Sequence, residues 1–384
     1  MNLEDVLLVS GPALVKPLSE DIMLLGVNIN SPIIVRRNKV LPFEALKDCK
    51  VEIHLGEDSW YKVERGNLGV KIWSNLTKEL NKKIIIIGPN DSGKSTLSSY
   101  LSNLAYQRGL KVGIVDGDLG QNDLSPPCCL GSALINRIIY DLRDVRANVI
   151  KFIGTNSPHK VTNLVIDKMV ELIEELKNVN TLIINTDGYL SKEGTLYKIK
   201  LCEELKVDKI IIIGEEEELI NPFKKFGDKV LVAKRPSLIA KDRNMRIQRR
   251  MNQYFRFLKD SRRVNLNLRD LKVYFFGETY KGNVEKDGIM EKVNGGRVSF
   301  IYHMDNFIYK EASNYTFTTY SLKDMFVGLG YEREVKGFGL IERISKNFDL
   351  TLLASKVDFD TLFLSVIKLK NMREEQLIPI IESR

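Results

Sequence analysis

The fold of this chain is decided by the stretch Gly88-Pro89-Asn90-Asp91-Ser92-Gly93-Lys94-Ser95-Thr96. It follows a run of isoleucines at 84–87, which is typical of a buried strand, and precedes a helix-like stretch from Leu97 to Arg108. The pattern G-x-x-x-x-G-K-[ST] between a strand and a helix is a phosphate-binding loop, or P-loop. Its backbone N–H groups and the positive end of the helix dipole attract phosphates. We therefore expect all nine residues of the loop to contribute to a nucleotide site.

Two residues of the P-loop have distinct expected roles. Lys94 is expected to reach the β- and γ-phosphates, and Ser95 to hold Mg²⁺ through its hydroxyl. The expected nucleotide is ATP, with GTP as the alternative. A chance glycine-rich turn is the other interpretation of the pattern, and the flanking strand and helix argue against it.

The amino-acid composition limits the classes of protein to which this chain can belong. The 384 residues are 43% hydrophobic and 28% charged, which predicts packed cores in two or three domains. No apolar run approaches the ~20 residues of a membrane span. The first residues lack the pattern of a signal peptide, so we expect a cytoplasmic protein without membrane contact. The four cysteines and three histidines lack the spacing of a zinc site, which favours reduced, buried cysteines.

The net charge of +8 is unevenly distributed along the chain. Lysines and arginines are dense between Lys234 and Arg263, where Asp242 and Asp260 are the only acidic residues. Such a positive field suits phosphates and nucleic acids, although an ordinary basic helix face would have the same composition.

Residues 76–263 alternate buried apolar runs with amphipathic stretches, which predicts an α/β domain with a parallel, doubly wound sheet. The expected strands are Ile84–Ile87, Val112–Val115, Val149–Ile153, Thr181–Asn185, Lys209–Ile213 and Lys229–Val232, and expected helices include Thr162–Lys177 and Leu196–Glu204. Short alternating runs predict β-rich domains at 1–75 and 264–384. In the latter, the glycine-rich segments 328–331 and 337–341 are expected to be turns that lead into strands. The expected architecture is thus a central P-loop domain between two β-rich domains.

Two carboxylates follow the second expected strand of the P-loop domain. Asp116 and Asp118 are two residues apart, so they share a face of an extended chain and address the edge of the sheet where ligands bind. One carboxylate near Mg²⁺ can organise its waters, and another can accept a proton from an attacking hydroxyl. The alternative is that one of them caps the following turn.

These motifs together resemble a known family. The P-loop, followed by Asp116-Gly117-Asp118-Leu119-Gly120-Gln121-Asn122-Asp123 and Pro126-Pro127, is similar to the polynucleotide 5′-hydroxyl kinases of tRNA splicing, mRNA 3′-end processing and rRNA maturation, and above all to the archaeal members. The resemblance covers roughly 75–263. It implies that Asp118, in an Asp-x-Gly-Gln motif, is the base on the RNA 5′-hydroxyl. It also implies that Gln121 helps to hold Mg²⁺ or the phosphates, beside Ser95 and Asp116.

Three further segments fit the resemblance. Thr155 and Ser157 lie in a segment, 154–158, that resembles a loop near the bound nucleic acid. The family's Thr-x-Gly-Trp clasp corresponds to Thr186-Asp187-Gly188-Tyr189, so the resemblance assigns substrate binding to Thr186, Gly188 and Tyr189. Tyr189 departs from the family tryptophan but can still stack on a base. Asn90 likewise departs from the usual threonine.

The third segment, 243–250, corresponds to the family's arginine-bearing lid within 234–263. Arg243 and Arg246 are the candidates for stabilising the transferring phosphoryl group. Arg249 and Arg250 are alternatively expected to face solvent or RNA.

The resemblance implies an ATP-dependent kinase that phosphorylates the 5′-hydroxyl end of RNA, with DNA as an alternative acceptor. The sequence identifies no protein partner. Two other functions stay open: a catalytically silent, ATP-bound scaffold of an RNA-processing complex, and a nucleotide-switch NTPase. The intact Lys94, Ser95 and Asp118 argue against a silent site, and the basic segment favours nucleic acid over a switch.

Overall fold

The computed structural model describes residues 1–65, 69–159, 161–236, 243–275, 278–281, 289–292, 297–303, 306–310, 322–345, 349–371 and 373–376. The chain forms two compact units. The first comprises 1–118, 132–149 and 169–245, and the second comprises 119–131, 150–168 and 246–384. The division into functional domains at 1–75, 76–263 and 264–384 stays a prediction.

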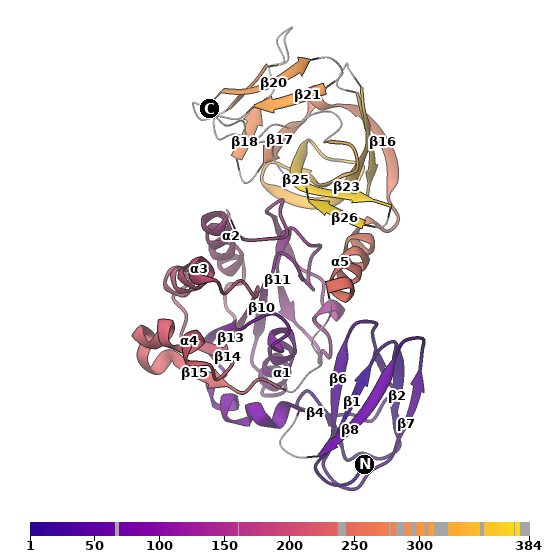
Figure 1. Cartoon of the computed structure of the whole chain (residues 1–384), viewed down its shortest axis with the longest axis vertical. Coiled ribbons are helices and arrows are strands. Elements are labelled where there is room, and N and C mark those ends of the chain that lie inside the picture. The colour runs from indigo at the N-terminus through magenta and orange to yellow at the C-terminus, as the bar shows by residue number, and fades with distance from the viewer. Residues whose placement is uncertain are drawn as a thin grey trace. The chain divides into compact units, whose positions relative to one another are not determined.

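The N-terminal part of the first unit is β-rich, as predicted (Figure 1). One antiparallel sheet has the order β4-β3-β6-β1-β8 and the other has the order β5-β2-β7. Alternating apolar side chains such as Leu7, Val9 and Phe43 form its core. The strands are β1 (Asp5–Ser10), β2 (Ala13–Pro17), β3 (Ile22–Leu24), β4 (Val27–Asn28), β5 (Ile33–Val35), β6 (Val40–Ala45), β7 (Val51–Leu55) and β8 (Trp60–Arg65), followed by the 3₁₀ segment η1 (Gly69–Glu79).

The predicted parallel sheet is confirmed for β10, β13, β9, β14 and β15, which pair in parallel within a sheet of the order β12-β11-β10-β13-β9-β14-β15. Its strands are β9 (Lys83–Ile87), β10 (Val112–Gly117), β11 (Cys129–Ile135), β12 (Val149–Phe152), β13 (Thr181–Thr186), β14 (Lys209–Ile213) and β15 (Val230–Ala233). The sequence did not predict β11, because Gly131, Ser132 and Ala133 dilute its apolar run. In the sequence, a strand that is buried on both faces usually appears as an unbroken run of apolar residues.

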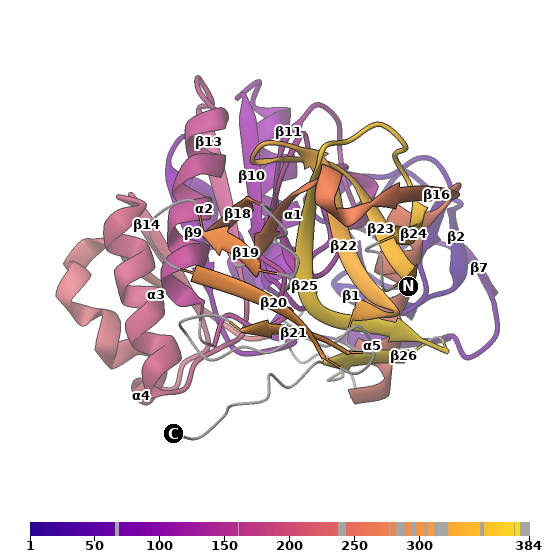
Figure 2. The ribbon, with the colours of Figure 1, turned by 90° about the horizontal axis from the view of Figure 1, so that it is seen from above.

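The helices of this region follow the doubly wound pattern. They are α1 (Lys94–Gln107), α2 (Thr162–Glu175), α3 (Lys192–Glu204) and α4 (Glu217–Ile220), with the 3₁₀ segments η2 (Leu142–Asp144) and η3 (Asn221–Lys229). The chain moves one way along the sheet from β9 to β10 and the other way from β13 to β14. Right-handed crossovers in opposite directions place their helices on opposite faces, and Figure 2 shows α1 and α3 in this arrangement. The carboxyl ends of β10, β13 and β9 therefore lie side by side.

The second unit is built around a large, mostly antiparallel sheet. Its order is β16-β24-β23-β22-β25-β17-β18-β19-β20-β21, and β26 pairs with β25. Its elements are α5 (Arg243–Leu258, whose residues up to Met245 are counted with the first unit), β16 (Arg262–Asn267), η4 (Leu268–Asp270), β17 (Lys272–Phe275), β18 (Glu278–Lys281), β19 (Ile289–Lys292), β20 (Arg297–His303), β21 (Asn306–Lys310), β22 (Met325–Tyr331), β23 (Glu334–Ile344), β24 (Asp349–Ala354), β25 (Thr361–Lys370) and β26 (Arg373–Gln376).

The glycine-rich segments of the second unit are not turns. Residues 328–331 lie in β22 and 337–341 lie in β23. A Cβ at Gly328 would lie 3.0 Å from the Phe152 ring, and one at Gly330 would lie 1.9 Å from the Glu334 carbonyl oxygen. Close packing, not a reversal of the chain, requires glycine at these positions.

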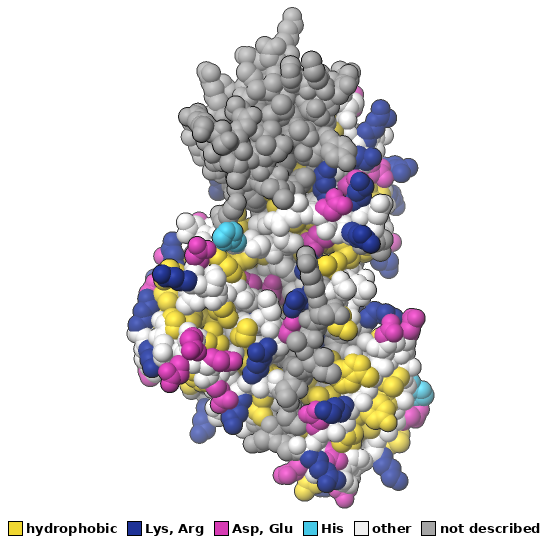
Figure 3. Space-filling model, in the orientation of Figure 1, with side chains coloured by type: hydrophobic (Ala, Val, Ile, Leu, Met, Phe, Trp, Pro, Cys, Tyr) yellow, Lys and Arg dark blue, Asp and Glu magenta, His cyan; other side chains and the backbone are white. Residues whose placement is uncertain are grey.

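Basic and acidic side chains are interspersed over the described part of the face drawn in Figure 3. All four cysteines are buried and unpaired, as predicted. Among the described residues, no helix is both long and apolar enough to cross a membrane.

Candidate nucleotide-binding and catalytic site

The P-loop connects β9 to α1, as the sequence predicts. Gly93 is the N-cap residue of α1 and has φ 99° and ψ 11°, a left-handed conformation that favours glycine. A Cβ at Gly88 would lie 2.7 Å from Ser92 Oγ. Gly88 and Gly93 thus allow the tight turn of the loop and the close approach of its backbone.

Ser92 shows that the loop fits an anionic ligand. Its side chain is fully buried, and its hydroxyl has no hydrogen-bond partner in the described structure. A buried hydroxyl is costly to leave unsatisfied. A phosphate oxygen held by the loop would supply the acceptor that this hydroxyl lacks.

Trp73 packs against the P-loop at Gly93. Its ring lies 3.4 Å from where a Cβ on Gly93 would be, and its Nε1 donates to the Lys234 carbonyl oxygen at 2.9 Å. Trp73 is therefore a packing residue of the core, as expected from the sequence.

Lys94 lies inside the loop. Its Nζ donates to the carbonyl oxygens of Gly88 at 2.9 Å and Pro89 at 2.8 Å. Burial lowers the pKa of Lys94, and the carboxylates of Asp118 and Asp187 oppose this shift. The ammonium group is thus held where the β- and γ-phosphates of a P-loop nucleotide lie.

The two carboxylates after β10 differ in their surroundings. Asp116 is fully buried, and its Oδ1 accepts from Asn185 Nδ2 at 2.9 Å and from the Asp118 backbone N–H at 3.2 Å. The interpretation that one aspartate caps the turn therefore applies to Asp116. Asp118 is partly exposed and acts electrostatically on Lys94. Asp116 thus orients the turn that presents Asp118 to the loop.

The clasp residues lie beside the P-loop within the same unit. Thr186 Oγ1 donates to the Ile86 carbonyl oxygen at 2.8 Å, so this side chain joins β13 to β9. A Cβ at Gly188 would lie 2.2 Å from Asn90 Oδ1 and 2.7 Å from Asn90 N. Only glycine allows the clasp to pack this closely on the loop. The Tyr189 hydroxyl donates to Glu193 at 3.0 Å, which orients the ring at the end of the clasp.

The structure adds a buried ion pair that sequence reasoning missed. Lys198 Nζ lies 2.7 Å from Asp187 Oδ2, and the two side chains are 0% and 7% exposed. Asp187 Oδ1 also accepts from the Tyr189 backbone N–H at 2.8 Å. Asp187 was visible only as the variable residue of the clasp motif, and Lys198 carried no signal within its helix. The pair holds the clasp against α3, and its two charges act oppositely on Lys94, whose pKa Asp187 raises and Lys198 lowers.

Replacing Lys198 with methionine is expected to lower the free energy of unfolding by about 3–5 kcal/mol, because it leaves the buried Asp187 carboxylate without its cation. Chemical denaturation measures this loss. The matched control is Lys192→Met, an exposed lysine of the same helix. The double variant Asp187→Asn, Lys198→Met should recover much of the stability. Equal stability of Lys198→Met and Lys192→Met would contradict the prediction.

Of the remaining predicted site residues, Gln121, Thr155, Ser157 and Arg246 belong to the second unit and Arg243 to the first. Gln121 Nε2 donates to the Arg246 carbonyl oxygen at 3.3 Å, so the Asp-x-Gly-Gln motif contacts the lid helix α5. Thr155 is buried, and its Oγ1 accepts from the Ser157 backbone N–H at 3.3 Å. Arg243 begins α5, but its side chain lies outside the described residues.

The expectation that Arg249 and Arg250 face solvent is wrong for Arg249, which is buried, whereas Arg250 is partly exposed. Arg249 is 8% exposed and pairs with Asp123 Oδ1 and Oδ2 at 2.5 and 2.7 Å. Arg250 pairs with Glu374, a buried carboxylate that also accepts from Asn156 Nδ2 at 2.6 Å and the Tyr254 hydroxyl at 3.1 Å. Glu374 thereby ties α5 and the 154–158 loop to β26. This connection was not visible in the sequence.

The donor set near the P-loop suits Mg²⁺ held together with a nucleotide. No group of three or more His, Cys, Asp or Glu side chains in the described part of the chain could hold a metal ion alone. Magnesium usually binds through one or two carboxylates plus substrate phosphates. The Ser95 hydroxyl and the Asp116 carboxylate are donors of the required type, so these residues fit the ion.

Comparisons with known proteins identify a matching family model and relatives of this chain. Residues 88–260 match the family model described as mRNA cleavage and polyadenylation factor CLP1 P-loop. The chain is 31% identical over 211 residues to a polyribonucleotide 5′-hydroxyl-kinase of Pyrococcus abyssi, covering 53% of this chain and 59% of that protein. It is 24% identical over 221 residues to the polyribonucleotide 5′-hydroxyl-kinase Clp1 of Bos taurus, covering 52% of each. The matches thus span little more than half the length of these curated relatives.

The fold also has a solved counterpart. A chain of the wild-type Clp1p–Pcf11p complex superposes with a TM-score of 0.70, covering 96% of both chains at 13% sequence identity. At this identity the likeness shows the fold alone. It confirms the predicted α/β architecture with β-rich flanks.

Proposed function

From the match of residues 88–260 to the CLP1 P-loop family model, we propose that this chain is an ATP-dependent polynucleotide 5′-hydroxyl kinase. The observation that carries the proposal is the convergence of Lys94, Asp118 and the clasp within one unit, at the carboxyl ends of β9, β10 and β13. A cation for the phosphates, a carboxylate for a hydroxyl proton and a stacking residue for a base are the parts that this reaction requires. RNA is the proposed acceptor, with DNA as the alternative.

The chemistry follows from the proposed roles of these residues. The Asp118 carboxylate accepts the proton of the RNA 5′-hydroxyl while the hydroxyl oxygen forms a bond to the γ-phosphorus of ATP. The bond from the γ-phosphorus to the bridging oxygen breaks, and ADP leaves. Lys94 balances the negative charge on the phosphates during transfer. Arg243 and Arg246 are the proposed lid residues that add to this stabilisation.

The proposed ligands of Mg²⁺ are Ser95, Asp116 and Gln121. When bound, Mg²⁺ neutralises charge on the phosphates. Asp116 also has a positioning role. Its Oδ1 accepts a hydrogen bond from the Asp118 backbone N–H, which holds Asp118, the proposed general base, in position.

The acceptor end is proposed to rest on the clasp, where Tyr189 would stack on the terminal base and Thr186 and Gly188 would shape its surroundings. The family resemblance alone proposes Thr155 and Ser157, in the second unit, as substrate-binding residues. The solved neighbour is part of a Clp1p–Pcf11p complex, and we extend the proposal to a protein partner for this chain.

Transfer of label from γ-labelled ATP to matched 5′-hydroxyl RNA and DNA oligonucleotides tests the proposal. We expect label on the RNA in the presence of Mg²⁺ and none on a control oligonucleotide of the same sequence that already carries a 5′-phosphate. Free phosphate without labelled oligonucleotide would instead indicate a nucleotide-switch NTPase. Bound ATP with neither product would indicate a silent scaffold.

A further inference from the structure

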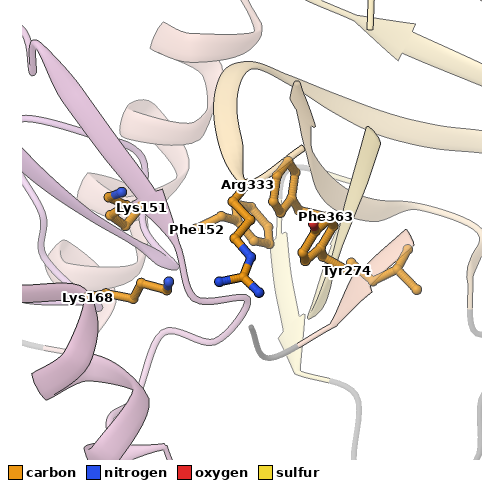
Figure 4. A pocket seen from close by; sticks show the side chains of 7 residues that line it. Lys151, Phe152, Lys168, Tyr274, Arg333 and Phe363 are labelled. Atoms are coloured by element: carbon orange, nitrogen blue, oxygen red, sulfur yellow. The ribbon is translucent and has the colours of Figure 1, made fainter. Parts of the chain in front are cut away.

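A small hollow lies beside β12, β17 and β25 in the second unit (Figure 4). The rings of Tyr274 and Phe363 stack there with centroids 5.1 Å apart, and Phe152 lies 6.1 Å from Phe363. All three rings are buried, and the hollow has room for about one water molecule. The rings therefore belong to the core of this unit. A buried polar atom in the first unit points to a ligand instead.

This polar atom is Oδ1 of Asn185, at the carboxyl end of β13. The side chain is 1% exposed, and among the described residues its Oδ1 has no hydrogen-bond partner. A buried acceptor is costly to leave unsatisfied, and nearly all such atoms in folded proteins have a partner from the protein, a water or a ligand. Asn185 Oδ1 is therefore expected to accept a hydrogen bond in the ligand-bound protein.

Asp116 fixes the orientation of the Asn185 carboxamide. Asn185 Nδ2 donates to Asp116 Oδ1 at 2.9 Å. The reversed carboxamide would set its oxygen against the carboxylate oxygen, which places one acceptor against another. Because Nδ2 and Oδ1 belong to one small planar group, Oδ1 also lies next to the Asp116 carboxylate.

The strand register places this carboxamide at the entrance to the P-loop. Asn185 is in register with Asp116 on β10 and with Ile86 on β9, two residues before Gly88. Asp116 Oδ1 also accepts from the Asp118 backbone N–H at 3.2 Å. Asn185 therefore belongs to the same hydrogen-bonded group as the proposed magnesium ligand Asp116 and the proposed base Asp118, and all of these residues lie in the first unit.

We propose that Asn185 is a positioning residue of the magnesium site, and that its Oδ1 accepts a hydrogen bond from a water bound to Mg²⁺. The ion usually keeps several of its waters when it binds through a carboxylate and substrate phosphates. A carboxamide can donate to a carboxylate and accept from a water at the same time. The inference deepens the proposed function and rests on it for the nucleotide-bound Mg²⁺ and for Asp116 as its ligand.

The test measures how strongly Mg²⁺ tightens ATP binding, as the ratio of the ATP dissociation constants without and with Mg²⁺ in calorimetric titrations. The variant Asn185→Leu keeps nearly the same shape but has no hydrogen-bonding group. We expect its ratio to fall about tenfold, the usual scale for losing a group that orients the surroundings of a metal ion. Its affinity for ATP without Mg²⁺ should stay close to that of the wild type.

The variant Asn185→Asp separates the two contacts of the side chain. It loses the donor to Asp116 but keeps an acceptor for the water. We expect its ratio to equal or exceed that of the wild type, because the added negative charge also attracts the cation.

The matched control is Asn180→Leu, the same change at the exposed residue that precedes β13. Asn180 Oδ1 accepts from the Lys111 backbone N–H at 2.9 Å, so the control also loses a side-chain hydrogen bond, at the opposite end of the strand. Its ratio should equal that of the wild type. Thermal unfolding of all variants separates a loss of stability from an effect on the ion.

An unchanged ratio in Asn185→Leu would overturn the inference, even in a less stable protein, because Asn185 would then support only the fold. A lowered ratio in Asn185→Asp would also overturn it, whether or not Asn185→Leu folds. These titrations need neither RNA nor phosphate transfer. A ratio lowered only in Asn185→Leu, with a wild type that labels no oligonucleotide, would support the inference and contradict the kinase proposal.

Discussion

Replacement of Lys94 by alanine is expected to lower the rate of phosphate transfer about 10³-fold, the scale of losing a charged donor that stabilises a phosphoryl transition state. The Lys94 ammonium is buried inside the loop and is held by the carbonyl oxygens of Gly88 and Pro89. No other cation is expected to occupy that position when the side chain is removed. The label-transfer assay at saturating ATP and RNA measures the loss.

The control for Lys94→Ala is Lys177→Ala, which removes an exposed lysine beyond α2 in the same unit. This variant should transfer phosphate at the rate of the wild type. The thermal unfolding of both variants should be measured, because the two hydrogen bonds of Lys94 also support the loop. A folded Lys94→Ala protein with wild-type transfer would exclude the proposed role.

Replacement of Asp118 by asparagine is expected to lower kcat by about 10²–10⁴-fold, the usual contribution of a general base. Asparagine has nearly the same shape but cannot accept the proton of the 5′-hydroxyl. The affinity for ATP should stay close to that of the wild type. Single-turnover transfer, together with a nucleotide-binding titration, separates the two effects.

The control for Asp118→Asn is Asp167→Asn, which makes the same change at an exposed position of α2. Near-normal kcat in Asp118→Asn would show that the base assignment is wrong. Loss of ATP binding in proportion to kcat would instead assign Asp118 to the nucleotide site, where its charge acts on Lys94.

Much of the central domain was predictable because its signals are local. The isoleucine run before Gly88 identifies a strand buried on both faces, and the P-loop pattern identifies the turn and the start of α1. The strand β11 was missed because its small residues carry a weak apolar signal. The glycines of β22 and β23 were misread as turns, since a sequence does not distinguish a glycine needed for chain reversal from one needed for close packing.

The candidate site was predictable only in part. Lys94, Asp118 and the clasp belong to motifs of a few residues, so each could be named from the sequence. The partner of Asp187 could not be named, because Lys198 is separated from it by a loop and the first turns of α3. The burial of Arg249 was likewise hidden, because Asp123 lies far away in the chain.

The amino-acid sequence by itself determined the phosphate-binding loop, the strands beside it and the residue types that suit phosphoryl transfer. Short-range backbone geometry and hydrophobic periodicity decide these features, and both can be read within a few residues. Only the tertiary structure decided which side chains meet. The order of the strands brings Asp116 to Asn185 and places Tyr274 against Phe363. Such contacts between segments distant in the chain depend on strand order and packing, which no local pattern records.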